Sequence, residues 1–578
     1  MASAVSNPNP GDGRPVPLRG YRLGLSEGQL FLLLAIVIGL ISGLLVVCFQ
    51  ISIERVQLGL LGSSLGAAPL RTILTPALMG LVVAFLVMRV FPRVRGSGVN
   101  QTKAAVYIYD GYIPFRTVIG KFITCALAIG SGQSLGPEDP SLQIGAGVAS
   151  ALGRRLRLSR EKVRLIAPVG AAAGLAAAFN SPIAAVLFVI EEVIGKWNAG
   201  VLGAIVLAAV SSVVVERGFR GSEPLFHIPV CHSVPAAELF AYAVLGVAGG
   251  VASLVLVKLV GFLRPRLKAL PRWTQYLQPA LAGLMIGIIG LRFPQVMGAG
   301  YQAMDQAINQ QYAWHMLALL AVFKILATTL SFTSGTPGGM FAPTLFIGAM
   351  LGGAVGRLEH HFFPQVAGSL GAYAMVGMGT LFAGFLRAPM TSVFMVLELS
   401  GNYSIIVPVM ISNTIAYLIA RNYQSVALFD MLTREDGIHL PSMEEEREQG
   451  TLRVEDAMRP AGGPVLEAED SVNTALLRAK GRADHFLLVR YQNGQWTGID
   501  ADALQALAGG EEGSLPLEEI YTNPRMPVLH PDQPLDLALS KIGDWPSLPV
   551  VSRADFRKLE GRVSIDDILR AYRNASSR

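Results

Sequence analysis

The chain has 578 residues, of which 52% are hydrophobic and only 15% charged, and its formal net charge is +6 at pH 7. A soluble domain carries about 25% charged residues, so this composition excludes an ordinary soluble protein. The positive charge does not indicate a nucleic-acid partner, because its visible clusters, Arg93–Arg95 and Arg154–Arg164, flank apolar stretches. Loops rich in Lys and Arg stay on the cytoplasmic side of a membrane, which explains these clusters.

The N-terminal part of the chain predicts a tail followed by a membrane helix. Residues 1–26 are polar and rich in Pro and Gly, which is typical of a disordered tail, here expected on the cytoplasmic side. Phe31–Phe49 has no charged side chain and is long enough to cross a hydrocarbon core of ~30 Å as a helix. This run is too long for the core of a signal peptide. We therefore expect it to remain as the first membrane helix.

Further apolar stretches recur along the chain, with few or no charged residues. They are Ile73–Met88, Val201–Val215, Leu239–Val257, Met316–Leu330 (interrupted by Lys324) and Ile405–Ile419. The sequence therefore predicts an all-α polytopic membrane domain. The three cysteines are scattered and two of them lie in apolar segments, which indicates neither a disulfide framework nor a metal cluster.

Two segments of the membrane region repeat one spacing. In both, a Val-Gly pair is followed by a proline after twelve residues and by a glutamate nine residues later. The positions are Gly170, Pro182 and Glu191 in the first segment and Gly377, Pro389 and Glu398 in the second. The repeat predicts two halves, near residues 27–217 and 235–422. Such repeats commonly assemble with inverted topology around a transport site near the bilayer midplane.

Three glycine-rich segments, residues 96–98, 130–140 and 334–343, interrupt the apolar helices. Backbone that is not helical is tolerated at membrane depth only where it is buried in protein or lines a cavity. Each break precedes a segment expected to be helical, and the free N–H groups at a helix N-terminus favour an anion. Taken singly, each break is also compatible with a loop between short helices. Comparable breaks in both halves favour a transport site.

These breaks resemble the three signatures of the CLC family of chloride channels and proton/chloride exchangers. The GSGIP signature appears as GSGVN from Gly96, GxEGP as GPEDP from Gly136, and GxFxP as GMFAP from Gly339. The resemblance covers residues from about 28 to 437. The glycines and prolines that carry the signatures are Gly96, Gly98, Gly136, Pro140, Gly339 and Pro343.

The resemblance implies roles for five residues. The anion would be held by the Ser97 hydroxyl and by the backbone N–H groups of Met340 and Phe341. Glu138 would be the gating and external proton glutamate, and its carboxylate can itself occupy an anion position. Glu192, at the end of the segment FNSPIAAVLFVIEE, would transfer the proton on the internal side.

A neighbouring glutamate is expected to be structural. Glu191 has an acidic counterpart in the second half, Glu398, whereas Glu192 corresponds to Leu399. Ionisable residues inside membrane segments are costly and usually functional. Retention of Glu192 therefore favours an exchanger over a channel, and Glu191 is expected to be a helix-end carboxylate or part of an ion pair.

Three departures from the family pattern affect the expected site. Asp139 replaces the glycine after the gating glutamate and puts a second carboxylate beside it. Val99-Asn100 replaces Ile-Pro. Phe429 stands at the position of the inner-gate tyrosine, with Tyr423 as the less favoured register. With Phe429 there, one hydroxyl donor to the inner anion site is missing, and selectivity or coupling is expected to be looser.

The C-terminal part of the chain predicts a soluble module. After a linker at 438–450, residues 451–578 have short alternating apolar runs and no segment able to span a bilayer. The stretch PSLPVV from Pro546 predicts a buried strand, and SIDDILRAYR from Ser564 an amphipathic helix. A small cytoplasmic α/β domain is therefore expected.

This module resembles a pair of CBS (cystathionine-β-synthase-type) domains. Segments opening at Val454 and Met526 match the starts of the two copies, and GRVSIDD matches the family ending. In that ending, Ser564 and Asp567 can bind the ribose of an adenine nucleotide. The first copy lacks the hydroxyl, so the alternative is a dimerisation and gating module without a ligand.

Together these features predict a proton-coupled chloride antiporter. We expect a homodimer in the cell membrane, with one pore per subunit, both termini cytoplasmic, and no required cofactor besides the transported ion. A passive or gated chloride channel of the same fold is the alternative, which Phe429 and Asp139 leave open. A CBS-regulated cation transporter is remote, because the breaks present amide donors where a cation needs carboxylates and carbonyls. No nucleophile–base pair or phosphate-binding loop is evident in the sequence, so an enzyme is not expected.

Overall fold

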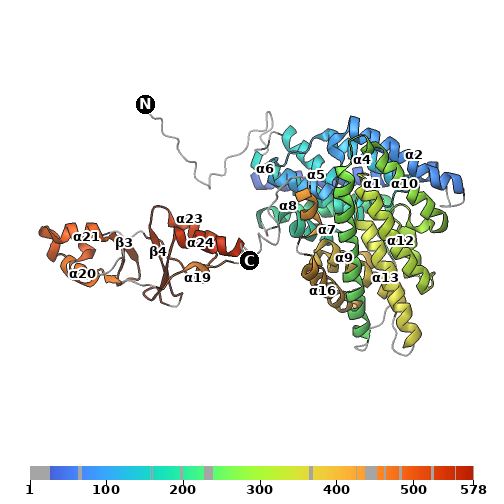
Figure 1. Ribbon diagram of the computed structural model, residues 1–578. Coiled ribbons are helices and arrows are strands. Elements are labelled where there is room, and N and C mark those ends of the chain that lie inside the picture. Colours follow the sequence, from blue (N-terminus) through green and yellow to red (C-terminus); the bar gives the residue numbers. More distant parts are fainter. Residues whose placement is uncertain are drawn as a thin grey trace. The chain divides into compact units, whose positions relative to one another are not determined.

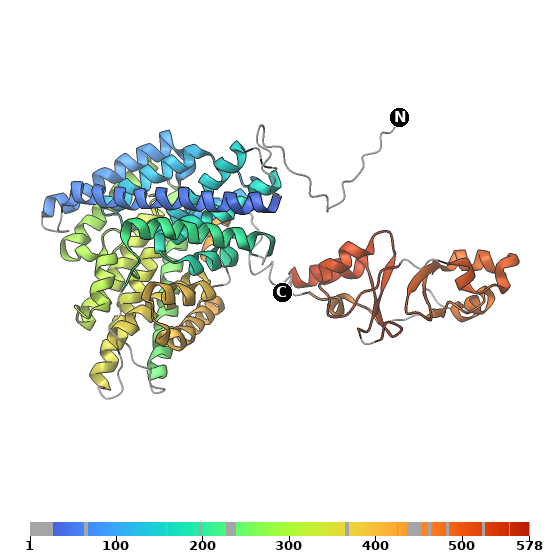
Figure 2. The ribbon, with the colours of Figure 1, turned by 180° about the vertical axis from the view of Figure 1, so that it is seen from behind.

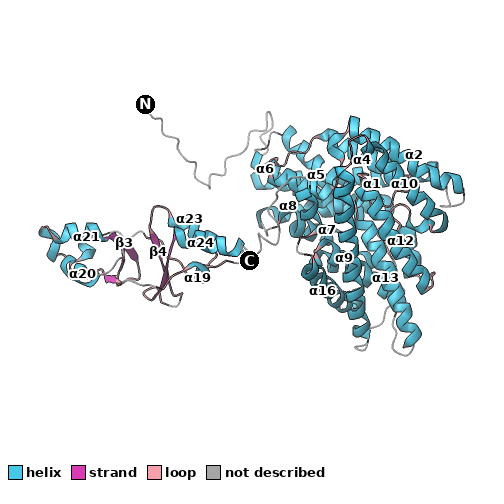
Figure 3. Cartoon of the chain, viewed as in Figure 1, coloured by secondary structure: helices cyan, strands magenta, loops and turns pink. Residues whose placement is uncertain are grey.

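The computed structural model describes residues 27–62, 68–156, 158, 160–195, 199–226, 238–363, 369–424, 426–435, 452–460, 464–480, 485–522, 526–553 and 555–576. The chain divides into two compact units, Met1–Leu440 and Pro441–Arg578. Among the described residues, the first unit is built of helices and the strands belong to the second (Figures 1 and 3). The predicted tail at 1–26 and the linker at 438–450 lie outside the described residues.

The first half of the membrane unit consists of long helices joined by short ones. They are α1 (Glu27–Leu61), α2 (Pro69–Phe85), η1 (Leu86–Val90), η2 (Pro92–Val94), α3 (Gly98–Tyr107), α4 (Phe115–Gly130), α5 (Glu138–Arg155), α6 (Arg160–Phe179), α7 (Pro182–Phe188), η3 (Val189–Ile194) and α8 (Ala199–Arg220). Here η1 and η3 are π-helical turns and η2 is a 3-10 turn. Helices α1 and α8 lie side by side (Figure 2).

The second half repeats this order of short and long helices. They are α9 (Leu239–Ala269), α10 (Thr274–Arg292), η5 (Pro294–Val296), α11 (Tyr301–Ile308), α12 (Trp314–Thr333), α13 (Phe341–Phe362), α14 (Leu370–Leu386), α15 (Pro389–Ser400), η6 (Tyr403–Ile405), α16 (Ile406–Tyr423) and α17 (Leu428–Glu435). The short helices α3 and α11 therefore occupy equivalent places in the two halves.

Nine helices of the described part are long and apolar enough to cross a membrane. They include all six stretches predicted from the sequence, so the prediction of a polytopic helical membrane protein is confirmed. The three that the sequence analysis missed are Lys162–Phe179, Thr274–Arg292 and Phe341–Phe362. The first and last of these are rich in Gly and Ala and largely buried inside the protein, so they need less apolar surface than a lipid-facing helix.

Glycines bring the buried helices of each half into backbone contact. A Cβ added to Gly145 of α5 would lie 2.1 Å from the carbonyl oxygen of Gly170 in α6. A Cβ added to Gly348 of α13 would lie 2.2 Å from that of Gly377 in α14. Only glycine fits at such crossings, and the same crossing occurs once in each half.

Each half caps helices of the other. The Glu191 carboxylate, in η3, accepts hydrogen bonds from the N–H (3.0 Å) and the hydroxyl (2.8 Å) of Thr391 at the start of α15. The Glu398 carboxylate, in α15, accepts from the N–H groups of Ile183 (3.0 Å) and Ala184 (2.8 Å) at the start of α7. Carboxylates at helix N-termini satisfy N–H groups that lack intrahelical partners. Glu191 thus has the structural role expected from its repeat counterpart.

The second unit contains two similar αββα modules. The first has β1 (Leu466–Glu467), α20 (Val472–Ala479), β2 (Phe486–Arg490), β3 (Trp496–Asp500), α21 (Ala501–Ala508), η7 (Glu511–Ser514) and α22 (Leu517–Ile520). The second has α19 (Val454–Ala457) packed with α23 (Leu535–Ile542), β4 (Ser547–Val551), β5 (Leu559–Ser564) and α24 (Ile565–Ser576).

The sheets of these modules are small. Strand β2 pairs in parallel with β1 and antiparallel with β3, and β4 pairs antiparallel with β5. The buried strand predicted near Pro546 and the helix predicted from Ser564 are confirmed as β4 and α24. The first module has a hydrophobic core of its own, and Leu488 and Trp496 of its strands also belong to the core of the second module.

Candidate functional site

The glycine-rich breaks meet at one place inside the membrane unit. Gly136 and Gly339 exchange two backbone hydrogen bonds, of 2.8 and 2.9 Å, so the breaks before α5 and α13 are directly paired. Pro140 and Pro343 are each the third residue of the helix that follows, where a missing N–H breaks no intrahelical bond. The two breaks, which occupy comparable places in the two halves of the sequence, thus meet in space.

The Glu138 side chain is fully buried where α5 begins. Its Oε2 accepts a hydrogen bond from the backbone N–H of Ala342 at 3.3 Å, and its Oε1 accepts one from the Tyr301 hydroxyl. The carboxylate thus reaches the first turn of α13, where a helix N-terminus favours an anion. Tyr301 was not identified from the sequence, although it follows a Gly-Ala-Gly triplet like the Gly-Ser-Gly before α3.

The Asp139 carboxylate lies at the start of α3. Its Oδ1 accepts from the Ser97 hydroxyl at 3.0 Å and from the Val99 N–H at 2.7 Å, and its Oδ2 accepts from the Gly98 N–H at 2.9 Å. Gly96, with φ of +94°, gives the chain the left-handed turn that delivers Ser97 to this position. The predicted anion donors of α3 are therefore engaged by a carboxylate of the chain itself.

Two buried lysines hold the loops before α3 and α11. Lys121 Nζ donates to the carbonyl oxygens of Val94 (3.1 Å) and Gly96 (2.7 Å). Lys324 Nζ donates to those of Val296 (3.0 Å) and Gly298 (2.7 Å). Each lysine thus binds the carbonyl oxygens of a loop and fixes the turn that precedes the helix. The sequence analysis noted Lys324 only as an interruption of an apolar run.

Phe341, the first residue of α13, lies among aromatic rings. Its ring centroid is 5.1 Å from that of Phe188, 5.5 Å from Phe382, and 6.3 Å from both Phe179 and Phe429. No described residue accepts a hydrogen bond from the N–H groups of Met340 or Phe341. Those two groups thus remain available to an anion beside an apolar wall.

The two candidate inner-gate residues differ in burial. Phe429 is 4% exposed and contacts Phe341, whereas Tyr423 is 66% exposed at the end of α16. Of the two residues, Phe429 is therefore the one that contacts the start of α13. The Asn100 side-chain amide donates to its carbonyl oxygen at 3.0 Å and ties α17 to α3.

Glu192 belongs to a buried cluster of three charges. Its Oε1 lies 2.8 Å from Lys103 Nζ, and the same ammonium lies 3.3 Å from Asp430 Oδ1. The three side chains come from η3, α3 and α17 and are between 1% and 11% exposed. Lys103 and Asp430 were not identified from the sequence, because their partnership joins residues 327 positions apart.

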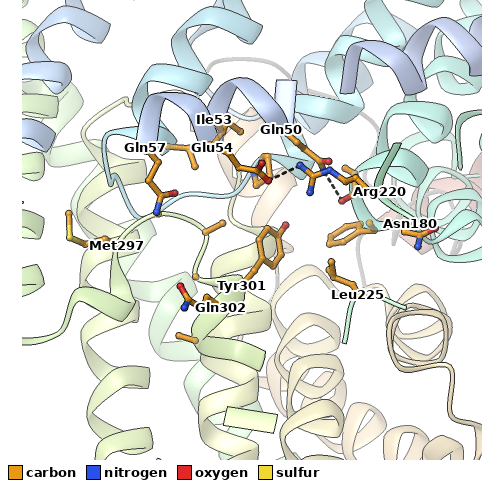
Figure 4. A pocket seen from close by; sticks show the side chains of 18 of the residues that line it. Gln50, Ile53, Glu54, Gln57, Asn180, Arg220, Leu225, Met297, Tyr301 and Gln302 are labelled. Atoms are coloured by element: carbon orange, nitrogen blue, oxygen red, sulfur yellow. Dashed lines mark hydrogen bonds and ion pairs between the residues drawn. The ribbon is translucent and has the colours of Figure 1, made fainter. Parts of the chain in front are cut away.

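A cavity of about 860 Å³ borders the other side of Tyr301. Residues of α1, α8 and α11 line it, with Pro137 directly before Glu138. Figure 4 shows the Tyr301 ring reaching into this space, with the ion pair of Glu54 and Arg220 (2.7 Å) opposite. Tyr301 thus borders both the cavity and the Glu138 side chain, and Pro137 borders the cavity directly before Glu138.

In the second unit, the two residues considered for nucleotide binding contact each other. The Ser564 hydroxyl donates to Asp567 Oδ2 at 2.7 Å, and Asp567 Oδ1 is paired with the guanidinium of Arg459. Asp567 is buried, and both of its oxygens already have partners. A ribose would have to replace at least one of these contacts.

Comparisons with known proteins agree with the resemblance. Residues 79–421 match the family described as "Voltage gated chloride channel". A protein of Ralstonia nicotianae named as a ClcB-like chloride channel protein is 32% identical over 424 residues, which are 71% of this chain and 99% of that protein. The H(+)/Cl(-) exchange transporter ClcA of Citrobacter koseri is 33% identical, over 68% of this chain and 85% of its own length.

Solved structures are similar as well. A slow cyanobacterial Cl−/H+ antiporter matches with a TM-score of 0.65 and 28% identity, over 70% of this chain and 97% of the antiporter. A eukaryotic CLC transporter matches with a TM-score of 0.61 and 20% identity, over 93% of this chain and 97% of its own. At this identity the second match concerns the fold alone.

Proposed function

The chain belongs to the CLC family of chloride channels and transporters, and on this premise we propose that it exchanges chloride for protons across a membrane. Relatives named as H(+)/Cl(-) exchange transporters and the Cl−/H+ antiporter structure support the exchange. The observation that carries the proposal is the position of Glu138, a titratable carboxylate bound to the N-terminus of α13. A group that competes with an anion for the same donors and also binds a proton can couple the two movements.

The outer step uses the two states of Glu138. As a carboxylate, it accepts from Ala342 N–H and excludes chloride from the start of α13. Once protonated, it has no charge for the helix N-terminus to stabilise, and chloride can take its place. The Tyr301 hydroxyl stands between Glu138 and the 860 Å³ cavity, through which we propose that protons and chloride reach the gate.

The chloride step uses neutral donors. We propose the N–H groups of Met340 and Phe341 as ligands, together with the Ser97 hydroxyl once it turns away from Asp139. Neutral donors suit an ion that must leave as readily as it binds. Phe429 closes this path on the inner side with a ring and without a hydroxyl, so chloride passes it with one donor fewer.

The inner proton step uses Glu192. A chain of contacts joins it to Glu138: Lys103 and Asp430 lead to Phe429, whose ring meets that of Phe341, and Phe341 adjoins Ala342. We propose that protons and chloride separate on the inner side of Phe341, where aromatic rings surround its side chain. The second candidate is a passive chloride channel, which the missing hydroxyl at Phe429 favours.

A gradient experiment tests the proposal. Purified protein in sealed liposomes with high internal chloride should drive protons against their gradient, and the external pH should change when a potassium ionophore dissipates the voltage. Chloride movement without any proton movement would favour the channel.

We further propose a homodimer in the cell membrane, with both termini cytoplasmic and the second unit a CBS pair. The two αββα modules support the CBS assignment, and the basic segment around Arg154 and Arg155 supports the orientation. Adenine-nucleotide binding at Ser564 and Asp567 is tested by calorimetry with ATP.

Because every proposed chloride or proton ligand precedes residue 437, deletion from residue 445 should leave anion flux intact. Loss of flux in a deletion that still assembles would contradict the proposal that the second unit is a separate regulatory module.

A further inference from the structure

The three charges around Glu192 do not balance. Lys103 supplies one positive charge, whereas Glu192 and Asp430 supply two negative ones, and all three side chains are buried. An uncompensated charge in a buried site is costly. One proton on either carboxylate brings the cluster to neutrality, so the cluster is composed to hold one proton.

The same cluster is attached to the inner end of the chloride path. Asp430 directly follows Phe429 in the first turn of α17. Two contacts hold this turn to α3: Lys103 to Asp430 at 3.3 Å, and the Asn100 amide to the Phe429 carbonyl at 3.0 Å. The strength of the first contact depends on which carboxylate carries the proton, whereas the second contact is neutral.

Two further charged side chains, on the same elements as Glu192 and Asp430, have different partners. Glu191, the neighbour of Glu192, accepts hydrogen bonds from Thr391 at the start of α15. Farther along α17, Glu435 is paired with Arg264 of α9 at 2.7 Å. The latter ion pair holds the other end of α17 and does not touch Glu192, so it provides a matched control.

We propose that Lys103 and Asp430 are positioning residues which, with Glu192, form a one-proton site that links proton occupancy to the position of Phe429. With the proton on Glu192, Lys103 pairs fully with Asp430 and holds the first turn of α17 against α3. With the proton on Asp430, or with both carboxylates ionised and sharing the ammonium, this hold weakens. The inference rests on the proposed exchange, because it assigns a role within the inner proton step.

Charge counting predicts an unusual mutational pattern. Asp430→Asn leaves one positive and one negative charge, so the cluster is neutral without a proton and proton uptake should fall. Lys103→Met leaves two carboxylates, which should share a proton and release it slowly. The double variant leaves Glu192 alone, which again needs one proton for neutrality. We therefore expect coupling to fall in each single variant and to return in part in the double variant, which regains the one-proton charge balance but lacks the contact between Lys103 and α17.

The test measures the proton-to-chloride ratio from the reversal potential in liposomes containing the full-length protein. Each single variant should lower the ratio by about tenfold while chloride flux continues, and Lys103→Met/Asp430→Asn should restore part of it. Asp430→Glu should keep the wild-type ratio, as should the control Glu435→Gln. A purely structural role predicts instead that the double variant is at least as impaired as the worse single variant, and that result would overturn the inference.

The double variant can be compared with Lys103→Met or with Asp430→Asn. The test therefore stands even if one of the two single variants does not fold. The outcome also separates this inference from the proposed function. Wild-type protein that moves no protons contradicts the exchanger itself. Wild-type protein that exchanges, together with an unchanged ratio in Asp430→Asn, contradicts only the one-proton cluster.

Discussion

The starts of α3 and α11 are built alike but bind the two carboxylates of α5 differently. Each follows a glycine turn held by a buried lysine, and each presents a hydroxyl to a carboxylate of α5. At α3, Asp139 accepts three hydrogen bonds of 2.7 to 3.0 Å, two of them from backbone N–H groups. At α11, Glu138 receives only the Tyr301 hydroxyl there and reaches across to a distant N–H at 3.3 Å.

The difference separates a fixed carboxylate from a movable one. The shorter aspartate side chain is bound by donors of one helix start, and its release would leave buried N–H groups without acceptors. The longer glutamate spans two helix starts and can leave by rotation of its own side chain. The two neighbouring residues of α5 are thus expected to act as a cap and a gate.

The largest effect on proton–chloride coupling is expected from replacement of Glu138, the gate. Glu138→Gln cannot ionise, so it should abolish proton movement and leave chloride movement passive. Glu192→Gln should also uncouple protons, but with an outer gate that still titrates. Proton and chloride fluxes recorded together in liposomes check both. Residual uphill proton transport in Glu138→Gln would contradict its role as the gate.

Replacement of Asp139, the cap of α3, should mainly lower the stability of the protein. Asp139→Asn replaces an acceptor of three bonds by a group with one acceptor oxygen, and it should lower the free energy of unfolding by about 1–3 kcal/mol. Thermal unfolding of the purified protein measures this, with Asp305→Asn on α11 as a half-buried control. Coupling should persist wherever the variant folds. A loss of coupling equal to that of Glu138→Gln would remove the distinction between cap and gate.

The Tyr301 hydroxyl should contribute less. Tyr301→Phe removes one donor to Glu138, worth about 0.5–1.5 kcal/mol, so the gate should open several-fold more often. Chloride flux should rise while the proton-to-chloride ratio is kept. Tyr312→Phe, which removes a hydroxyl bonded to Gln306 farther along the chain, serves as the control. Slower flux in Tyr301→Phe would instead make the hydroxyl part of the proton route.

The smallest change concerns selectivity at α3. Ser97 has φ of −70°, a value that proline adopts, so Ser97→Pro should preserve the turn while deleting the hydroxyl. The preference should shift from chloride toward nitrate, since related nitrate exchangers of the family carry proline there. Competitive flux assays measure the shift. Unchanged selectivity would mean that Ser97 serves Asp139 alone.

The sequence predicted features that are local. The three breaks, the duplicated Gly-Pro-Glu spacing and the strongly apolar helices each lie within a short window, and the sequence shows the breaks, the spacing and six of the nine candidate membrane helices of the described residues. Membrane helices covered by protein were missed, because Gly- and Ala-rich segments such as Lys162–Phe179 lack the apolar character of lipid-facing ones. Both candidate glutamates come from the family pattern, and their roles stay predictions.

The partners of those glutamates could not be found in this way. Tyr301 lies 163 residues from Glu138, and Lys103 lies 327 residues from Asp430. Which long-range pairs form is decided by how the two halves pack, and no local pattern encodes this. Asp139 was noticed as a departure from the family pattern, but its role as the cap of α3 became visible only from its three bonds.

The mutual capping of the halves has a consequence for biosynthesis. As the chain leaves the ribosome, the first half enters the membrane while Glu191 still lacks Thr391, and Gly136 lacks Gly339. Completion of α7 likewise waits for Glu398. We therefore expect a product that stops after α8 to be recognised as incomplete and degraded. We expect the first half of the membrane unit to finish folding only after the second half has been inserted. Until then, the incomplete first half would be exposed to membrane proteases.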